Sequence, residues 1–176
     1  MAPMSDWLFE APTLDQAGSR VTGATAARSG ERRIIHEIIS GFSRYQRTVQ
    51  SLPPGERAKI ARMARIVEDS FRPQRVPIRM ILLVGHADRD VARGVRFEEQ
   101  ISAQRALAVQ TALSAAIRDR KILARLTWHR VASGSRQPVA PNASAERDRA
   151  RNRRVEILLR PIEYGTTDVP LRSAAR

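Results

Sequence analysis

The chain contains no cysteine in its 176 residues, which excludes disulfide bonds and thiolate-ligated metal sites. No window approaches 18 consecutive apolar residues, so the sequence predicts no transmembrane helix. Its first residues lack a basic stretch followed by an apolar run, so no secretory signal peptide is visible there. The length suits one hydrophobic core better than two.

Lysine is nearly absent too. Lys59 and Lys121 are the only lysines, so 31 basic residues minus two leaves 29 arginines, and the formal net charge is +13. This charge has two explanations: a compositional bias toward arginine, or attraction to a polyanion such as nucleic acid, an anionic membrane or acidic wall polymers. Aromatic residues make up only 5% of the chain and no nucleic-acid-binding motif is recognised, which makes nucleic acid the weaker choice.

Composition divides the chain into three parts. Residues 1–33 are rich in Ala, Gly, Ser and Thr without sustained periodicity, which predicts a flexible N-terminal arm. Within it, Trp7-Leu8-Phe9 is an apolar cluster that could dock on a partner protein or fold back onto the core. Residues 34–161 carry the periodic apolar patterns of one folded domain, and residues 162–176 form a short polar tail.

Within residues 34–161 the patterns predict an α/β two-layer sandwich of β-α-β-α-β-β order, with two helices covering one face of the sheet. The predicted strands are 35–42, 78–84, 124–133 and 155–160, and the predicted helices run from the Ser51–Pro54 start to about Ser70 and from Phe97 to Asp119. A long polar connection, 134–151, ends in a segment with the composition of a short helical turn.

Nothing in the sequence indicates an enzyme, a cofactor or a metal site. The histidines His36, His86 and His129 lie in different elements without metal-ligand spacing. His86 and Asp88 are two residues apart at a strand end, as in some metal hydrolases, but no second group at a similar strand end completes such a site. The prediction is therefore a non-catalytic protein.

One buried charge stands out. Ile101, Arg105 and Val109 are spaced by four and lie on one helix face, so Arg105 is aligned with core residues. An unpaired buried guanidinium is costly and needs a partner. The nearest candidate is Asp88, at the end of the apolar strand 78–84, or a ligand charge that uses both side chains. Without further information, a plain salt bridge between the two is the simpler explanation.

Four segments together resemble the OmpA C-terminal-like (OmpA/Pal/MotB) domain, which binds peptidoglycan. They are G-H-A-D at 85–88, F-E-E-Q-I-S-A-Q-R-A-L-A-V at 97–109, P-V-A-P-N-A-S at 138–144 and R-N-R-R-V-E-I at 151–157. The resemblance covers about residues 34–161. It implies peptidoglycan as the partner and a place in the Gram-negative cell envelope or periplasm. Without a visible signal peptide, it also implies a leader outside this chain or signal-independent export, perhaps within a larger envelope or injection machine.

The resemblance also implies a ligand and its binding residues. Diaminopimelate of the wall peptide carries an ammonium and a carboxylate on one carbon, which Asp88 and Arg105 would hold, with Arg105 as a bidentate fork. Asn152 and Arg153 would contribute further contacts. Glu98 stands where the family has Asn and would bring a negative charge near the ligand carboxylate, and Ala87 replaces a family Thr. The alternatives are an arginine-rich nucleic-acid binder and a scaffold that keeps the fold without the ligand.

Overall fold

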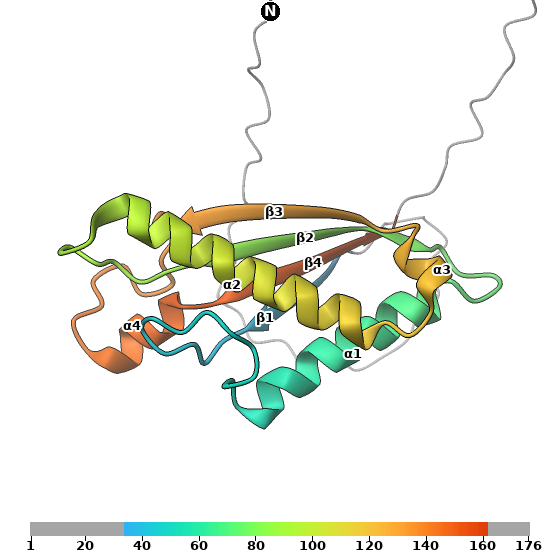
Figure 1. The fold of residues 1–176 in the computed structure, drawn as a ribbon, viewed down its shortest axis with the longest axis horizontal. Helices are drawn as coiled ribbons and strands as arrows, with labels where there is room; N and C mark the ends of the chain where they lie inside the picture. Colours follow the sequence, from blue (N-terminus) through green and yellow to red (C-terminus); the bar gives the residue numbers. More distant parts are fainter. Residues whose placement is uncertain (1–33, 162–176) are drawn as a thin grey trace, which may run out of the picture. The chain divides into compact units, whose positions relative to one another are not determined.

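The computed structural model describes residues 34–161, which form a four-stranded sheet with two long helices on one side (Figure 1). The predicted arm 1–33, with Trp7-Leu8-Phe9, and the predicted tail 162–176 lie outside the described residues. In chain order the elements are β1 (Ile35–Ile39), α1 (Pro54–Ser70), β2 (Ile78–His86), α2 (Gly94–Ala116), α3 (Arg120–Leu123), β3 (Thr127–Gly134), α4 (Glu146–Asn152) and β4 (Val155–Pro161). The predicted α/β fold class is confirmed.

The sheet has the strand order β1-β4-β2-β3, which places the most apolar strand inside it. β2 pairs antiparallel with β4 and parallel with β3, while β1 pairs antiparallel with β4. Ile78, Ile81 and Leu83 of β2 are fully buried, as the nearly continuous apolar run predicts. The parallel β2–β3 pair needs a crossover, which α2 and α3 provide.

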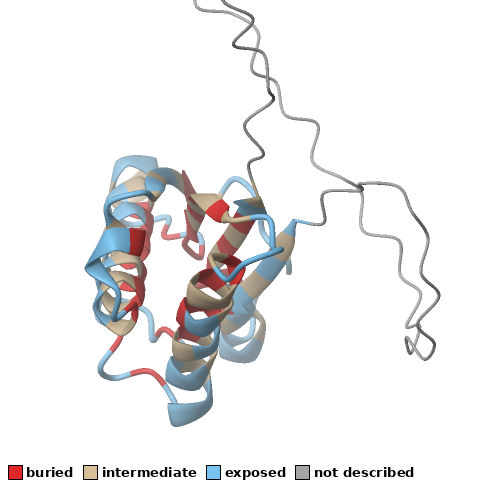
Figure 2. Ribbon diagram, turned by 90° about the vertical axis from the view of Figure 1, so that its right-hand side faces the viewer, coloured by how far each residue is buried: buried red, intermediate tan, exposed pale blue. Residues whose placement is uncertain are grey.

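Both long helices bury one face toward the sheet (Figure 2). Ile60, Met63 and Val67 of α1 and Val109 and Leu113 of α2 are at most 3% exposed, at helical spacing. α1 has proline in its first turn, where a missing N–H costs nothing. Among residues 34–161, no helix is long and apolar enough to cross a membrane.

α2 lies directly against the backbone of β2 at Gly85. A Cβ atom on Gly85 would lie 2.0 Å from the carbonyl oxygen of Ser102 in α2, far closer than any side chain permits. Glycine is therefore required there, and the contact fixes the height of α2 above the strand that leads to Asp88.

The first strand is shorter than predicted. It ends at Ile39, not at Phe42, because the chain turns at Gly41 with a φ of 82°. Phe42 therefore lies outside the pairing of β1 with β4, and its carbonyl accepts a hydrogen bond of 2.8 Å from Nε of Arg153.

The second long helix is shifted toward the N-terminus relative to its prediction and begins at Gly94 rather than Phe97. It ends at Ala116 because Asp119 caps a separate short helix, α3, by accepting a hydrogen bond from the backbone N–H of Lys121. The residues up to Leu126 complete this turn, so β3 begins at Thr127 and not at Ala124. The short helical turn predicted before the last strand is α4.

Candidate ligand-binding site at the end of strand β2

The loop after β2 carries Asp88 and is fixed to both neighbouring strands. The backbone N–H of His86 donates to the carbonyl of Arg154 at 2.9 Å, and that of Ala87 donates to the carbonyl of Gly134 at 2.8 Å. Ala87 is 2% exposed, so its methyl group is buried within the loop. Asp88 therefore extends from a backbone that is held as firmly as the sheet itself.

Asp88 is buried and pairs with Arg153. Nη1 of Arg153 lies 3.2 Å from Oδ2 of Asp88, while Nε of Arg153 donates to the carbonyl of Phe42. Nη2 of Arg153 also binds the largely exposed carboxylate of Glu146. The other carboxylate oxygen of Asp88, Oδ1, receives no hydrogen bond from residues 34–161 and is available to a ligand donor.

Arg105 is 0% exposed, and its guanidinium binds backbone carbonyls. Nε donates to Gln46 at 2.9 Å, Nη1 to His86 at 3.1 Å, and Nη2 to Ser43 at 3.1 Å and Arg44 at 2.9 Å. Of the five N–H groups of a guanidinium, four are thus used. A bidentate grip on a ligand carboxylate would require Arg105 to release one of these carbonyls.

Asp88 and Arg105 nonetheless influence each other's charge. The pKa of Arg105 is lowered to about 10: burial and the neighbouring charges of Arg153 and Arg47 lower it, and the negative charge of Asp88 acts in the opposite direction. Within residues 34–161 the two side chains form no direct ion pair: Arg105 donates to backbone carbonyls, and Arg153 pairs with Oδ2 of Asp88. The predicted pair is therefore a three-charge cluster in which Arg153 takes the place expected for Arg105.

Glu98 is buried at 3% exposure and directed at the loop. Its Oε1 accepts the backbone N–H of Asp90 at 2.6 Å, and its Oε2 accepts the hydroxyl of Ser135 at 2.5 Å. Both carboxylate oxygens thus join the Asp88–Asp90 loop to the end of β3. The Glu98 carboxylate, which was expected to face a ligand carboxylate, is thus hydrogen-bonded within the protein.

Asn152 holds the long connection before α4. Its side-chain amide donates to the carbonyl of Ala140 at 2.9 Å and accepts the N–H of the same residue at 2.8 Å. Asn152 therefore shapes the loop beside Arg153, and no contact aims its amide at Asp88.

Glu156 lies on the face of the sheet opposite the buried Val155 and Ile157, where it joins two histidines and an arginine. Its carboxylate lies 3.1 Å from Nε2 of His36, 3.2 Å from Nε2 of His86 and 2.7 Å from Nη2 of Arg154. His86 lowers the pKa of Glu156 most, burial raises it and Arg154 lowers it further, to about 2. The network ties β1, β2 and β4 together next to Asp88.

Comparison with known proteins supplies the fold family. Neither a protein-family model nor a curated protein sequence matches the chain. Solved structures do match, among them the peptidoglycan-associated lipoprotein from Burkholderia pseudomallei, at a TM-score of 0.50 and 24% identity over 69% of this chain and 88% of that chain. The chain has the OmpA C-terminal-like fold.

Two further structures agree. The cell wall anchor of the T6SS from Pseudomonas aeruginosa matches at a TM-score of 0.51 and 26% identity, over 73% of this chain and 82% of that one. The C-terminal domain of Helicobacter pylori MotB matches at 0.52 and 22% identity, over 72% and 87%.

Within this OmpA-like fold, sequence reasoning missed an aromatic and cationic cluster at the edge of the site. The hydroxyl of Tyr45 donates to Oδ2 of Asp90 at 3.2 Å, and Phe97 meets the Tyr45 ring edge-on with centroids 5.9 Å apart. Cζ of Arg93 lies 4.2 Å from the Tyr45 ring centroid and 4.7 Å from that of Phe97. Arg93 directly precedes α2 and Phe97 lies in its first turn, so their spacing by four was the signal available in the sequence.

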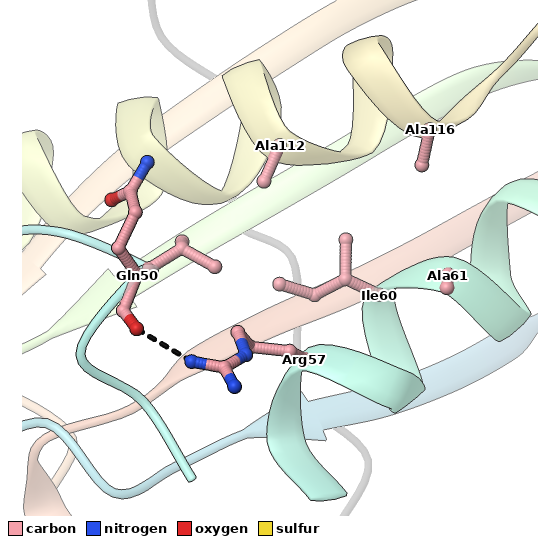
Figure 3. A pocket seen from close by; sticks show the side chains of 7 residues that line it. Gln50, Arg57, Ile60, Ala61, Ala112 and Ala116 are labelled. Atoms are coloured by element: carbon pink, nitrogen blue, oxygen red, sulfur yellow. Dashed lines mark hydrogen bonds between the residues drawn. The ribbon is translucent and has the colours of Figure 1, made fainter. Parts of the chain in front are cut away.

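Away from these residues, the OmpA-like fold has a cavity of about 250 Å³ between α1 and α2 (Figure 3). It is mostly apolar, and Arg57 at its edge donates to the carbonyl of Gln50 at 2.6 Å. None of the predicted site residues lines it. Residues 34–161 also contain no group of three or more His, Asp or Glu side chains that could hold a metal ion.

Proposed function

We propose that the chain is a non-catalytic peptidoglycan-binding module that anchors to the cell wall. The fold supports this, because the matching structures include a peptidoglycan-associated lipoprotein and a cell wall anchor. The observation that carries the proposal is Asp88, whose carboxylate is held by Arg153 through one oxygen and has the other free of protein donors in residues 34–161.

The ligand group is the diaminopimelate of the wall peptide. Its ammonium donates to Oδ1 of Asp88 in a charge-assisted hydrogen bond. Its carboxylate lies toward Arg105, which has one Nη1 hydrogen outside its four carbonyl bonds and keeps that region positive. Arg153 holds Asp88 in position and Asn152 fixes the adjoining loop, so both shape the site without gripping the ligand.

Such a ligand assigns the protein to the cell envelope, on the periplasmic side. The T6SS cell wall anchor among the similar structures supports a place in a larger envelope or injection machine. The apolar cluster Trp7-Leu8-Phe9 is then the segment proposed to bind a protein partner.

Sedimentation with purified sacculi tests this function. The wild-type chain should co-sediment, and free meso-diaminopimelate should compete. Asp88→Ala and the closer isostere Asp88→Asn should each weaken binding at least about tenfold, as expected for the loss of a charge-assisted contact. Asp69→Ala removes an aspartate near the end of α1, with a side chain that is 43% exposed and pairs with Arg72, and should bind normally.

Failure of the wild type to sediment, or binding that diaminopimelate does not compete, would overturn the proposal. Tight binding to DNA with a steep dependence on salt, and none to sacculi, would favour the arginine-rich nucleic-acid binder instead.

A further inference from the structure

Two arginines are arranged around one exposed aromatic ring at the edge of the site. Tyr45 is 42% exposed, with Cζ of Arg93 4.2 Å and Cζ of Arg44 5.3 Å from its ring centroid. Guanidinium groups stack on aromatic rings through cation–π attraction and keep their N–H donors at the edge, directed away from the ring. The ring thus limits the motion of both guanidinium groups.

This cluster carries excess positive charge. Asp90 is its one carboxylate, and it is 4% exposed. Oδ2 of Asp90 accepts the Tyr45 hydroxyl at 3.2 Å and lies 3.6 Å from Nη2 of Arg44, while Oδ1 accepts the backbone N–H of Arg93 at 3.2 Å. Within residues 34–161, the guanidinium of Arg93 has no carboxylate partner.

Two buried side chains, Arg105 and Glu98, hold the backbone segments that carry the cluster. Arg105 binds the carbonyls of Ser43, Arg44 and Gln46, so the segment that carries Arg44 and Tyr45 is bound to α2. Glu98 binds the N–H of Asp90, two residues beyond Asp88. Arg105 therefore also positions the loop, and Arg44 and Arg93 are the exposed cations of the cluster.

We propose that Arg44 and Arg93, arranged on Tyr45, form a second anion site that binds another carboxylate of the same wall peptide. The proposal rests on the proposed function, since it takes the diaminopimelate to be held at Asp88. A wall peptide in which a free glutamate carboxylate precedes the diaminopimelate has the required chemistry. A guanidinium binds a carboxylate through two parallel N–H donors and loses most of this interaction when the carboxylate becomes an amide.

Calorimetry with two synthetic peptides tests the second site. The first is L-Ala-γ-D-Glu-meso-diaminopimelate, and the second is the same peptide with the glutamate α-carboxylate amidated. Wild type should bind the acid about tenfold more tightly than the amide, the size expected for a charge-assisted hydrogen bond. The double variant Arg44→Gln/Arg93→Gln should bind both peptides equally, at the wild-type affinity for the amide.

The matched control is Arg62→Gln/Arg72→Gln, which likewise removes two exposed positive charges, one on α1 and one just after it. This control should keep the tenfold preference for the acid peptide over the amide. That result would distinguish a specific site from general electrostatic attraction. Equal binding of both peptides by the wild type, or an unchanged preference in Arg44→Gln/Arg93→Gln, would overturn the second site while leaving sacculus binding intact. Absence of binding to either peptide and to sacculi would overturn both proposals.

Discussion

Arg153 and Asp88 form an ion pair inside the protein, with Nη1 3.2 Å from Oδ2 and side chains that are 2% and 6% exposed. The pair joins the end of β2 to the start of β4, through residues 65 positions apart in the chain. Removal of Arg153 leaves the buried carboxylate of Asp88 without its ion-pair partner, and removal of Asp88 leaves Arg153 paired only with the largely exposed Glu146. Either loss is more costly than losing a surface pair.

A double-mutant cycle measures this pair. Asp88→Ala and Arg153→Met should each lower the free energy of unfolding by about 3 kcal/mol, and the double variant should lose clearly less than their sum. Urea unfolding followed by circular dichroism gives all four values. Additive losses would mean that the two charges do not stabilise each other.

Substitution of Arg105 tests its role as a carbonyl binder. Arg105→Lys keeps the charge but cannot place donors on four carbonyls at once, so we expect a loss of about 2–4 kcal/mol in unfolding free energy. The control is Arg96→Lys, at an exposed position of the same helix, which should change stability by less than about 0.5 kcal/mol. A wild-type-like Arg105→Lys would contradict the structural role.

Glu98 and its neighbour Glu99 provide a matched comparison. Glu98→Gln leaves one acceptor oxygen for the N–H of Asp90 and the hydroxyl of Ser135, so it should destabilise by about 1–3 kcal/mol. Glu99 pairs with Arg136 at the surface, and Glu99→Gln should cost no more than about 1 kcal/mol. Thermal and urea unfolding of the two variants decide this. Stronger sacculus binding by Glu98→Gln would instead indicate that its charge repels the ligand.

Stability should depend on pH through Glu156. Its pKa falls from 4.5 in the unfolded chain to about 2 in the folded protein, so the unfolded state takes up the proton first. The resulting stabilisation is fully present above pH 4.5 and is lost as the pH falls toward 2. The difference in unfolding free energy between wild type and Glu156→Gln should therefore shrink by at most about 3 kcal/mol over this interval. A difference that stays constant from pH 5 to pH 2 would contradict this.

The fold could be predicted because its elements have local signatures. The apolar run 78–84 identifies β2 without any long-range information, and the spacing of Ile101, Val109 and Leu113 by multiples of four does the same for α2. Helix ends were less accurate because they depend on single contacts, such as the capping of α3 by Asp119.

The contacts of the site could be predicted only in part. The sequence shows that Arg105 needs a partner, but the partners are backbone carbonyls up to 62 residues away, and a carbonyl has no residue-type signature. Arg153 was assigned to the site by resemblance alone, and its pairing with Asp88 depends on the β2–β4 register. Tyr45 and Arg93 come together only after folding, so their cluster was not predicted.

The central position of β2 has a mechanical consequence. Asp88 follows the end of a strand that is hydrogen-bonded on both sides, to β4 and to β3. A pulling force applied at Asp88 along this strand acts in shear on both ladders at once, and the strand cannot peel away one bond at a time as an edge strand can. A tether attached at this point would share its load across the middle of the sheet before any single hydrogen bond gives way.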